Sequence, residues 1–439
     1  MAADGSEALL VGVGFRPEIA GPLLRGEGEA TFLELLLEER LASRERALEA
    51  EALAEMRPVV VHGTKLSLGS AEGIDEGRAT LLGDLARRTR AFAVTEHAAF
   101  VRSGGVEIGH LTPVPFSRAA ADVIARNVAR ARRRLPDVPL LLENVAWPLR
   151  PGGDEMSEAE FYALLVERTG ARLLFDVGNL YANARNAGVD PFDALRDFPV
   201  EAADMIHLAG SLERGGFVYD THAHAVPEDV FAMLELTLDR RGRVPIVLER
   251  DHGLDWTEVS GEIGKAAAIG RQARPAGGES RDLAANREAL SFRKGMPALS
   301  SPPAPLRSAE GEEALCAEGR EALRVDQVAL ARALAGIEAD ERLDPVAVAR
   351  ARDILTHKRV EESLPLLPRL RAFAGVAPLA ERHAHGTVRP RRRAAVTDAR
   401  AIAEAAAASS DGALALAARL DRLALDARFV FDAEGASPR

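Results

Sequence analysis

The chain is short of cysteine and of long apolar runs, and each shortage excludes a class of protein. Cys316 is the single cysteine among 439 residues, so the chain has neither an internal disulfide nor a set of thiolate ligands for a zinc or iron–sulfur site. Any metal must therefore be bound by nitrogen and oxygen. No apolar run approaches the roughly 18–20 residues that span a bilayer, and the acidic, polar start is unlike a signal peptide. We therefore expect a cytoplasmic protein without a membrane segment.

Basic residues are outnumbered by acidic ones, and the imbalance lies in the first part of the chain. Lys and Arg total 56 against 67 Asp and Glu, which gives a net charge of −11. Residues 1–272 contain 43 acidic and 30 basic residues. Such an excess of acid repels a phosphate backbone, so nucleic acid is not expected as a substrate. The arginine tract at 389–393 is interpreted as a solvated loop.

Eight short apolar runs, rich in Val, Leu and Ile, alternate with helical stretches over residues 1–272. The runs cover 8–13, 32–37, 59–61, 92–94, 139–142, 173–175, 205–206 and 244–248. Continuous apolar runs that alternate with helices indicate a parallel sheet covered on both faces. Eight such units in about 250 residues are typical of a (β/α)8 TIM barrel. A doubly wound open sheet is the structural alternative.

The composition changes after the eighth unit. Residues 273–311 are rich in Pro, Gly and Ser and predict a flexible linker. Helical periodicity returns over 312–378, which we interpret as a small helical domain. The remaining segment, 379–439, is predicted to hold a basic loop and one C-terminal helix from Thr397 to about Leu425.

Six consecutive runs, the third to the eighth, end in or are soon followed by His, Asp, Glu or Asn. Active sites of TIM barrels are assembled at these strand ends, and converging carboxylates are costly there unless cations offset them. A strand-end histidine taken alone is more often a hydrogen-bonded structural group. The number of donors exceeds what one ion takes and suits two or three, and imidazole with carboxylate suits zinc, iron or manganese equally. The candidate ligands are His62, His97, Glu143, Asp176, Asn179, His207, Asp220, His222 and Glu249.

With these residues in place, the first 272 residues resemble the multinuclear non-heme iron-dependent oxidases, a family formerly described as a domain of unknown function. The motifs follow one another in family order from residue 12 to residue 222. They include Gly12-Val13-Gly14-Phe15-Arg16-Pro17, His62-Gly63-Thr64, Thr95-Glu96-His97, Leu142-Glu143-Asn144, Asp176-Val177-Gly178-Asn179, Ile206-His207-Leu208-Ala209-Gly210 and Asp220-Thr221-His222.

The resemblance implies two or three iron ions in mixed Fe(II)/Fe(III) states, with dioxygen as co-substrate. It implies that the enzyme modifies a ribosomally made precursor peptide, most often at cysteine. One iron would be held by His62, His97 and Glu143, and a second by Glu143, Asp176, His207 and Glu249. Asn179, Asp220 and His222 would hold a third. The six residues of the first two sets are the predicted catalytic residues, and Glu96 and Asp251 are expected to orient imidazoles or to form salt bridges.

The sequence departs from the family pattern at Glu39, Val145 and Ser211, where relatives usually have asparagine, proline and histidine. None of these positions is a proposed ligand, so the departures concern the substrate. A zinc- or manganese-dependent hydrolase or isomerase on a related barrel is the alternative function. A metal-binding or scaffold protein without activity is a third.

Residues 326–370 resemble a C-terminal extension found on some members of this family. Relatives often depend on a separate partner protein that binds the leader segment of the precursor. We expect the C-terminal region to supply or replace that docking function. An oligomerisation or stabilising role is the alternative.

Overall fold

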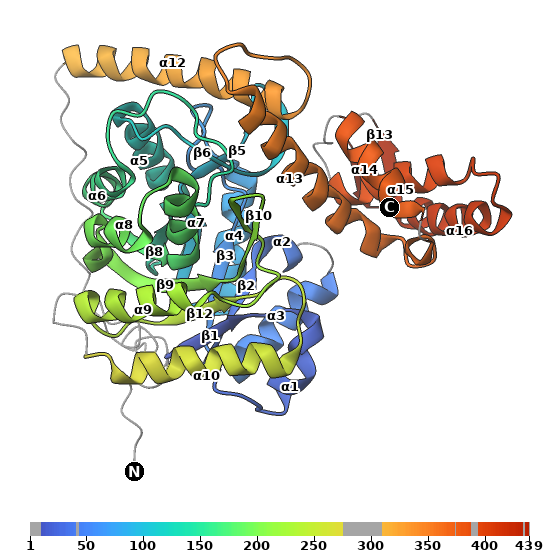
Figure 1. The fold of residues 1–439 in the computed structure, drawn as a ribbon. Coiled ribbons are helices and arrows are strands. Elements are labelled where there is room, and N and C mark those ends of the chain that lie inside the picture. Colours follow the sequence, from blue (N-terminus) through green and yellow to red (C-terminus); the bar gives the residue numbers. More distant parts are fainter. Residues whose placement is uncertain are drawn as a thin grey trace.

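The first part of the chain forms a closed barrel of eight parallel strands. The computed structural model describes residues 10–40, 44–274, 310–373, 375–387, 394–432 and 435–438. The strands pair in the order β1-β12-β9-β8-β7-β4-β3-β2 and close on themselves (Figure 1). They are β1 (Val11–Gly14), β2 (Phe32–Leu36), β3 (Val59–Gly63), β4 (Ala93–His97), β7 (Leu140–Glu143), β8 (Arg172–Asp176), β9 (Ala203–Ala209) and β12 (Ile246–Glu249). Each predicted run supplies one strand, which confirms the TIM barrel and excludes the open sheet.

Helices surround the barrel, and several begin at a side chain that caps the free backbone N–H groups of the first turn. Ser157 and Glu160 form a reciprocal capping box at α6, and Asp255 accepts hydrogen bonds from two backbone N–H groups of α10. The helices of this part are α1 (Ala20–Leu24), α2 (Leu37–Arg40), α3 (Arg44–Met56), α4 (Glu76–Arg88), α5 (Arg118–Arg132), α6 (Glu158–Thr169), α7 (Val177–Ala187), α8 (Pro191–Asp197), α9 (Glu228–Arg241) and α10 (Trp256–Gln272).

The interior of the barrel is built in layers, and the lower layer is apolar. It consists of Phe32, Val60, Phe92, Ala93, Leu141, Leu174, Met205 and Val247, each at most 2% exposed. Side chains two positions apart on a strand point to the same face. The next inward-facing layer toward the carboxyl ends of the strands is therefore occupied by the residues two positions further on. Seven of these are polar: Glu34, His62, Thr95, Glu143, Asp176, His207 and Glu249. The apolar layer is the floor on which this polar layer rests.

Two β-hairpins extend the mouth of the barrel, and neither was predicted. The first, β5 (Ala99–Ser103) with β6 (Val106–Pro113), follows β4; the second, β10 (Ser211–Arg214) with β11 (Phe217–Asp220), follows β9. Both leave from the carboxyl ends of strands that carry candidate ligands. His110 lies in β6.

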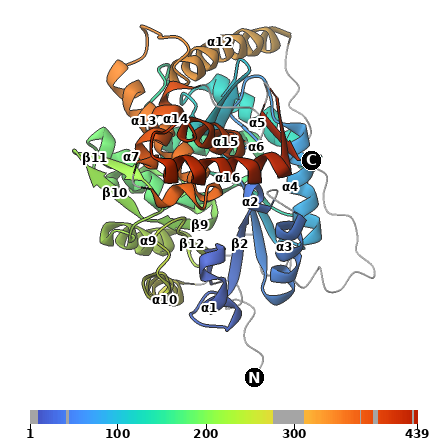
Figure 2. The ribbon, with the colours of Figure 1, turned by 90° about the vertical axis from the view of Figure 1, so that its right-hand side faces the viewer.

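The C-terminal region is helical, as predicted, and its apolar side chains divide between two cores. Its elements are α12 (Glu310–Leu334), α13 (Pro345–Ser363), α14 (Val376–Gly386), α15 (Ala394–Ala406), α16 (Gly412–Arg428), β13 (Phe429–Asp432) and β14 (Gly435–Pro438). Leu323 and Leu330 of α12 join the barrel core, and Gln327 donates a hydrogen bond to the backbone oxygen of Gly69. From Val360 onward the helices share a separate core. Figure 2, in which these helices face the viewer, shows them in front of the barrel.

Two predictions for the C-terminal region differ from the structure. The single helix expected from Thr397 to about Leu425 is wrong, because Asp411 caps a new helix, α16, by accepting hydrogen bonds from the N–H groups of Ala413 and Leu414. The boundary predicted after residue 378 falls inside α14, so the two apolar cores divide the chain elsewhere. Most of the predicted linker, 275–309, and the arginine tract 389–393 lie outside the described residues. Among the described helices, none is long and apolar enough to cross a membrane.

A buried ion pair holds the second core together and leads to a prediction. Both carboxylate oxygens of Asp398 accept hydrogen bonds from Arg359, at 2.8 and 2.9 Å, and Arg359 also donates to the backbone oxygens of Ala384 and Thr387. Removing one partner of a buried pair typically costs about 3–5 kcal/mol. We expect Asp398→Asn to lower hydrogen-exchange protection of α13–α16 while protection of the barrel strands is unchanged. Glu321→Gln, which breaks an exposed ion pair with Arg324, is the control; equal loss of protection in the barrel would contradict the prediction.

Candidate metal centre

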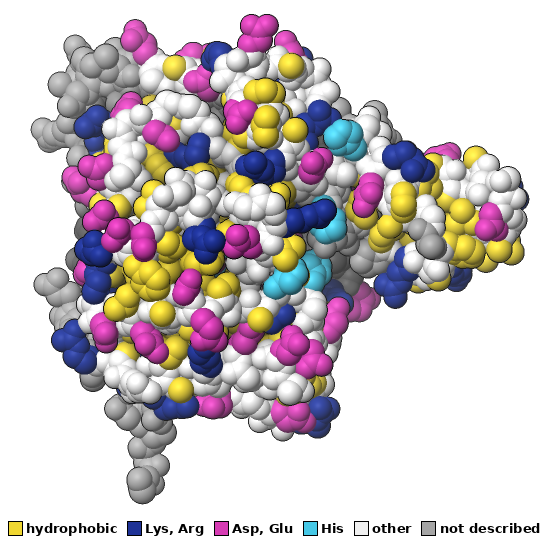
Figure 3. Space-filling model, in the orientation of Figure 1, with side chains coloured by type: hydrophobic (Ala, Val, Ile, Leu, Met, Phe, Trp, Pro, Cys, Tyr) yellow, Lys and Arg dark blue, Asp and Glu magenta, His cyan; other side chains and the backbone are white. Residues whose placement is uncertain are grey.

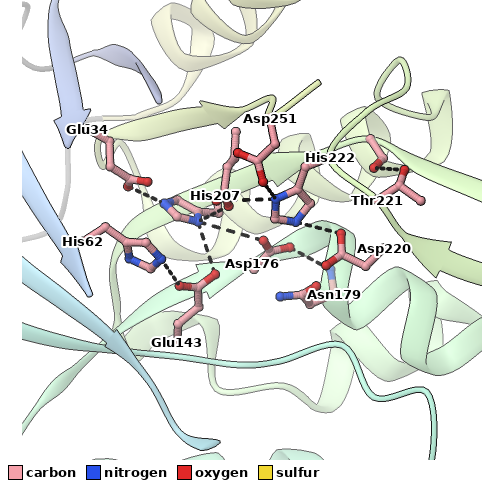
Figure 4. A network of polar contacts seen from close by, with 12 residues as sticks. Glu34, His62, Glu143, Asp176, Asn179, His207, Asp220, Thr221, His222 and Asp251 are labelled. Atoms are coloured by element: carbon pink, nitrogen blue, oxygen red, sulfur yellow. Dashed lines mark hydrogen bonds and ion pairs between the residues drawn. The ribbon is translucent and has the colours of Figure 1, made fainter. Parts of the chain in front are cut away.

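The polar layer and the loops above it bring all nine predicted ligands to one end of the barrel. His62, Glu143, Asp176, His207 and Glu249 stand at the ends of β3, β7, β8, β9 and β12, and each is at most 6% exposed. His97 lies one step further out on β4 and is 5% exposed. Asn179 lies in the first turn of α7, directly after β8; Asp220 is the last residue of β11, and His222 follows that strand. Figure 4 shows side chains of the cluster, among them His62, Glu143 and His222, converging from different elements.

Glu143 lies at the centre of the inner part of the cluster. Its Oε2 lies 3.1 Å from His97 Nε2 and 3.7 Å from His62 Nε2, and its Oε1 lies 3.2 Å from His207 Nδ1. One carboxylate therefore contacts three imidazoles from three strands. Glu143 is therefore a candidate for a ligand shared between two donor sets.

Barrel acceptors fix the orientation of the first two imidazoles. His62 Nδ1 lies 2.7 Å from Thr95 Oγ1, and His97 Nδ1 lies 3.3 Å from the backbone oxygen of Gly63. Because these contacts occupy Nδ1, the Nε2 atoms of both rings face Glu143. Metal-binding histidines are commonly held in this way by a hydrogen bond on the second nitrogen.

The outer part of the cluster centres on His222. Its Nε2 lies 2.8 Å from Asp220 Oδ1, and its Nδ1 lies 3.4 Å from Glu249 Oε1 and 3.3 Å from Asp251 Oδ2. Arg16 forms an ion pair with Asp251 from the opposite side. The backbone of His222 has φ of 51°, a left-handed conformation that is uncommon for a residue other than glycine. Such strain is retained where the surroundings demand one side-chain position.

Two asparagines position Asp176 and the start of α7. Asn144 donates from Nδ2 to the backbone oxygen of Asp176 and accepts the Asp176 N–H at Oδ1, at 2.9 and 2.8 Å. Asp176 Oδ1 accepts the N–H of Asn179 at 2.7 Å and so caps the helix. Asn179 in turn donates from Nδ2 to the backbone oxygen of Asn144. The second oxygen of Asp176 and the amide oxygen of Asn179 stay available.

The buried acids and imidazoles of the cluster shift one another's pKa values. Burial lowers the pKa of His97, but the charges of Glu143 and Glu96 outweigh it and raise that pKa to about 9. Burial raises the pKa of Glu143, yet the neighbouring imidazoles bring it below its ordinary value, and the same holds for Glu249. Burial, and then the charge of Glu143, raise the pKa of Asp176 well above its ordinary value.

Two observations indicate that these donor atoms suit metal ions. Within the cluster, four buried oxygen atoms accept no hydrogen bond from the described residues, namely Glu34 Oε2, Glu143 Oε2, Asp176 Oδ2 and Asn179 Oδ1. Such groups are costly unless another partner satisfies them. Donor atoms also gather in sets that lie within 4.8 Å of one another: His62, His97 and Glu143; Glu143, Asp176, His207 and Glu249; Glu34, His62 and Glu249; and His222, Glu249 and Asp251. Both observations are expected of a cluster built for cations.

The first two sets contain the same residues as the two iron sites implied by the family resemblance, although metal binding itself stays a prediction. The third implied set, Asn179, Asp220 and His222, stays a prediction: donor atoms of Glu249 and Asp251 gather with those of His222, and Asp220 Oδ1 lies 2.8 Å from His222 Nε2. Glu34 was missed. It lies within an apolar run instead of at its end, and only its spacing of two from Phe32 could have placed it in the polar layer.

Comparisons with known proteins agree over the barrel. A family model described as RiPP precursor modification enzyme MbnB/TglH/ChrH matches residues 10–271. A UPF0276 protein of Streptomyces avermitilis is 42% identical over 265 residues, which cover 58% of this chain and 53% of that protein, so the chain spans about half the length of that relative. A UPF0276 protein of Caulobacter vibrioides is 35% identical over 242 residues, which cover 55% of this chain and 86% of that protein. A xylose isomerase-like TIM barrel protein from Mycobacterium smegmatis in complex with magnesium aligns with a TM-score of 0.44 and 12% identity, over 60% of this chain and 97% of that chain.

The central place of Glu143 leads to a prediction about metal content. Because Glu143 belongs to two donor sets, the isosteric change Glu143→Gln should weaken two metal sites at once. We expect elemental analysis to find two or three transition-metal ions per wild-type chain and at most one in the variant. Glu213→Gln, on the exposed hairpin β10–β11, is the control and should retain the wild-type content. Equal metal content in Glu143→Gln and wild type would contradict the central role of this carboxylate.

The raised pKa of His97 leads to a prediction about pH. In the metal-free chain the proton of His97 stabilises the fold fully below pH 6.5, and this contribution is lost as pH rises through about 9. The same proton must leave before the imidazole binds a metal. Metal affinity should therefore increase between pH 6.5 and about 9, with protons released on binding. Titration with zinc against a competing chelator measures the affinity. Repeating the titration in buffers of different ionisation enthalpy measures the protons released. Affinity that does not change with pH in this range would contradict the prediction.

Proposed function

We propose, starting from the fact that this chain belongs to the MbnB/TglH/ChrH family of RiPP precursor modification enzymes, that its barrel is an iron-dependent oxidase of a ribosomally synthesised peptide. The proposed substrate is a precursor peptide that is modified at cysteine, with dioxygen as the oxidant. The observation that carries the proposal is the convergence of three imidazoles on Glu143, a buried carboxylate, in a family of peptide-modifying enzymes.

Two or three iron ions, in mixed Fe(II)/Fe(III) states, would be held by the donor sets of the inner cluster and by the residues around His222. Bound iron would supply the redox chemistry with dioxygen and a binding place for a substrate thiolate. The choice of iron rests on the family resemblance, because nitrogen and oxygen donors suit zinc and manganese as well. A zinc- or manganese-dependent hydrolase or isomerase is therefore the competing function.

The chain's own residues would prepare the site for this chemistry. Thr95 and the backbone of Gly63 hold His62 and His97 with Nε2 toward Glu143, so little reorganisation is needed when a cation binds. The apolar floor beneath the polar layer excludes water from below. A dry, oriented site strengthens each electrostatic contact and limits side reactions of an oxidant.

Contacts between the C-terminal helices and the mouth of the barrel support a role for these helices in substrate docking. Arg350 of α13 lies over the ring of Phe217 in β11, 4.3 Å from its centroid, and Lys358 Nζ lies 3.4 Å from His110 Nδ1 in β6. One helix thus contacts both hairpins at the mouth. Figure 3 shows histidine side chains on the side of the barrel that faces these helices. We propose further that this region binds the precursor, or replaces a separate leader-binding protein. A cytoplasmic location stays a prediction from the sequence.

Reconstitution with a cognate precursor tests the function. The full chain loaded with Fe(II) should change the mass of a cysteine-bearing peptide encoded beside it, only when dioxygen is present. A peptide with Cys→Ala should be unmodified, because the thiol is the proposed anchor. The zinc-loaded chain should be inactive. A zinc-loaded chain that hydrolyses or isomerises a substrate without dioxygen would contradict the oxidase proposal and support the competing function.

A further inference from the structure

Glu34 is a buried carboxylate of the polar layer on β2, a strand from which no ligand was predicted. Glu34 is 1% exposed, and its Oε1 lies 2.7 Å from His207 Nε2. The other nitrogen of the ring, Nδ1, lies 3.2 Å from Glu143 Oε1 and 3.2 Å from Glu249 Oε2. The imidazole of His207 therefore stands between Glu34 on one side and the predicted metal pocket on the other (Figure 4).

We propose that Glu34 is a positioning residue: it accepts the N–H of His207 at Nε2, so that Nδ1 presents its lone pair to a metal ion held with Glu143 and Glu249. A neutral imidazole carries one N–H, and the acceptor near one nitrogen decides which nitrogen is free for a metal. This inference rests on the metal cluster of the proposed function, and it depends on neither iron nor dioxygen.

The three inner imidazoles follow one pattern, which supports this role. His62 Nδ1 meets Thr95 Oγ1, His97 Nδ1 meets a backbone oxygen, and in both rings the second nitrogen faces Glu143. Glu34 takes the corresponding place for His207. Glu34 is charged and lies closer to its imidazole than Glu96, whose Oε1 is 3.5 Å from His97 Nδ1. A charged acceptor makes the hydrogen bond stronger and increases the basicity of the ligand nitrogen.

A direct ligand role for Glu34 is the alternative to be separated from this one. The donor atoms of Glu34, His62 and Glu249 lie within 4.8 Å of one another, and Glu34 Oε2 accepts no hydrogen bond within the described residues. A ligand and a positioning residue differ in what their loss changes. Loss of a ligand removes a metal equivalent, whereas loss of a positioning group weakens and perturbs a site that is still filled at high metal concentration.

The experiment compares Glu34→Gln and Glu34→Ala with the wild-type full chain, using Co(II) as the probe metal. Stoichiometry at saturating Co(II), affinity against a chromophoric chelator and the visible ligand-field spectrum are measured. Thr95→Val is the matched control, because it removes a neutral acceptor from a different imidazole, His62. Circular dichroism of each metal-free variant checks that the barrel is folded.

We expect both Glu34 variants to keep the wild-type Co(II) stoichiometry. Affinity at one site should fall about 10–100-fold for an outer-sphere partner, with a shifted spectrum. Glu34→Gln should lie nearer to wild type than Glu34→Ala, since an amide oxygen still accepts the N–H. Thr95→Val should leave that spectral component unchanged.

Two results would overturn the proposal. Loss of a full Co(II) equivalent in both variants would make Glu34 a ligand, and affinity and spectrum equal to wild type would show that it does not act on His207. A wild-type chain that binds no metal would instead contradict the proposed function itself, so the two failures are distinguishable.

Discussion

The structure depends on the burial of several carboxylates and imidazoles directly above an apolar floor. Strand alternation places Glu143 and His207 two positions beyond Leu141 and Met205, and the barrel leaves them almost no contact with water. Buried anions are tolerated when they are paired with cations or hydrogen-bonded. Against the effect of burial, Glu143 and Glu96 raise the pKa of His97, so that a proton on this imidazole would offset part of the charge in the absence of metal. With metal, the same donors have a stronger partner.

The arrangement of hydrogen bonds indicates that the cluster is organised before a cation arrives. Each inner imidazole has one nitrogen near a fixed acceptor and the other near Glu143. Asn144 holds Asp176 through two backbone contacts, and Arg16 holds Asp251. Thr95, Asn144 and Arg16 lie on or directly after strands next to those of the groups they contact, whereas Glu34 on β2 reaches His207 on β9 across the interior of the barrel. The C-terminal helices reach the mouth through both hairpins, which links the added region to the residues that follow β4 and β9.

Much of the fold and of the candidate site could be predicted from the sequence, because both rest on local patterns. Apolar runs of the right length located all eight strands, and polar residues at their ends located the cluster. Glu34 escaped because it interrupts a run whose other members are apolar, and its role depends on register with neighbouring strands. The hairpins escaped because their short strands pair only with each other. The break between α15 and α16 depends on the Asp411 cap, and the division of the C-terminal cores depends on packing that periodicity does not reveal.

Anomalous X-ray diffraction from crystals of the metal-loaded protein tests the central claim most directly. Data collected above and below the iron absorption edge would locate each ion without reference to the amino-acid model. We expect two or three anomalous-difference peaks within coordination distance of Glu143, His207 and His222. Peaks confined to the protein surface, with none among these side chains, would contradict it.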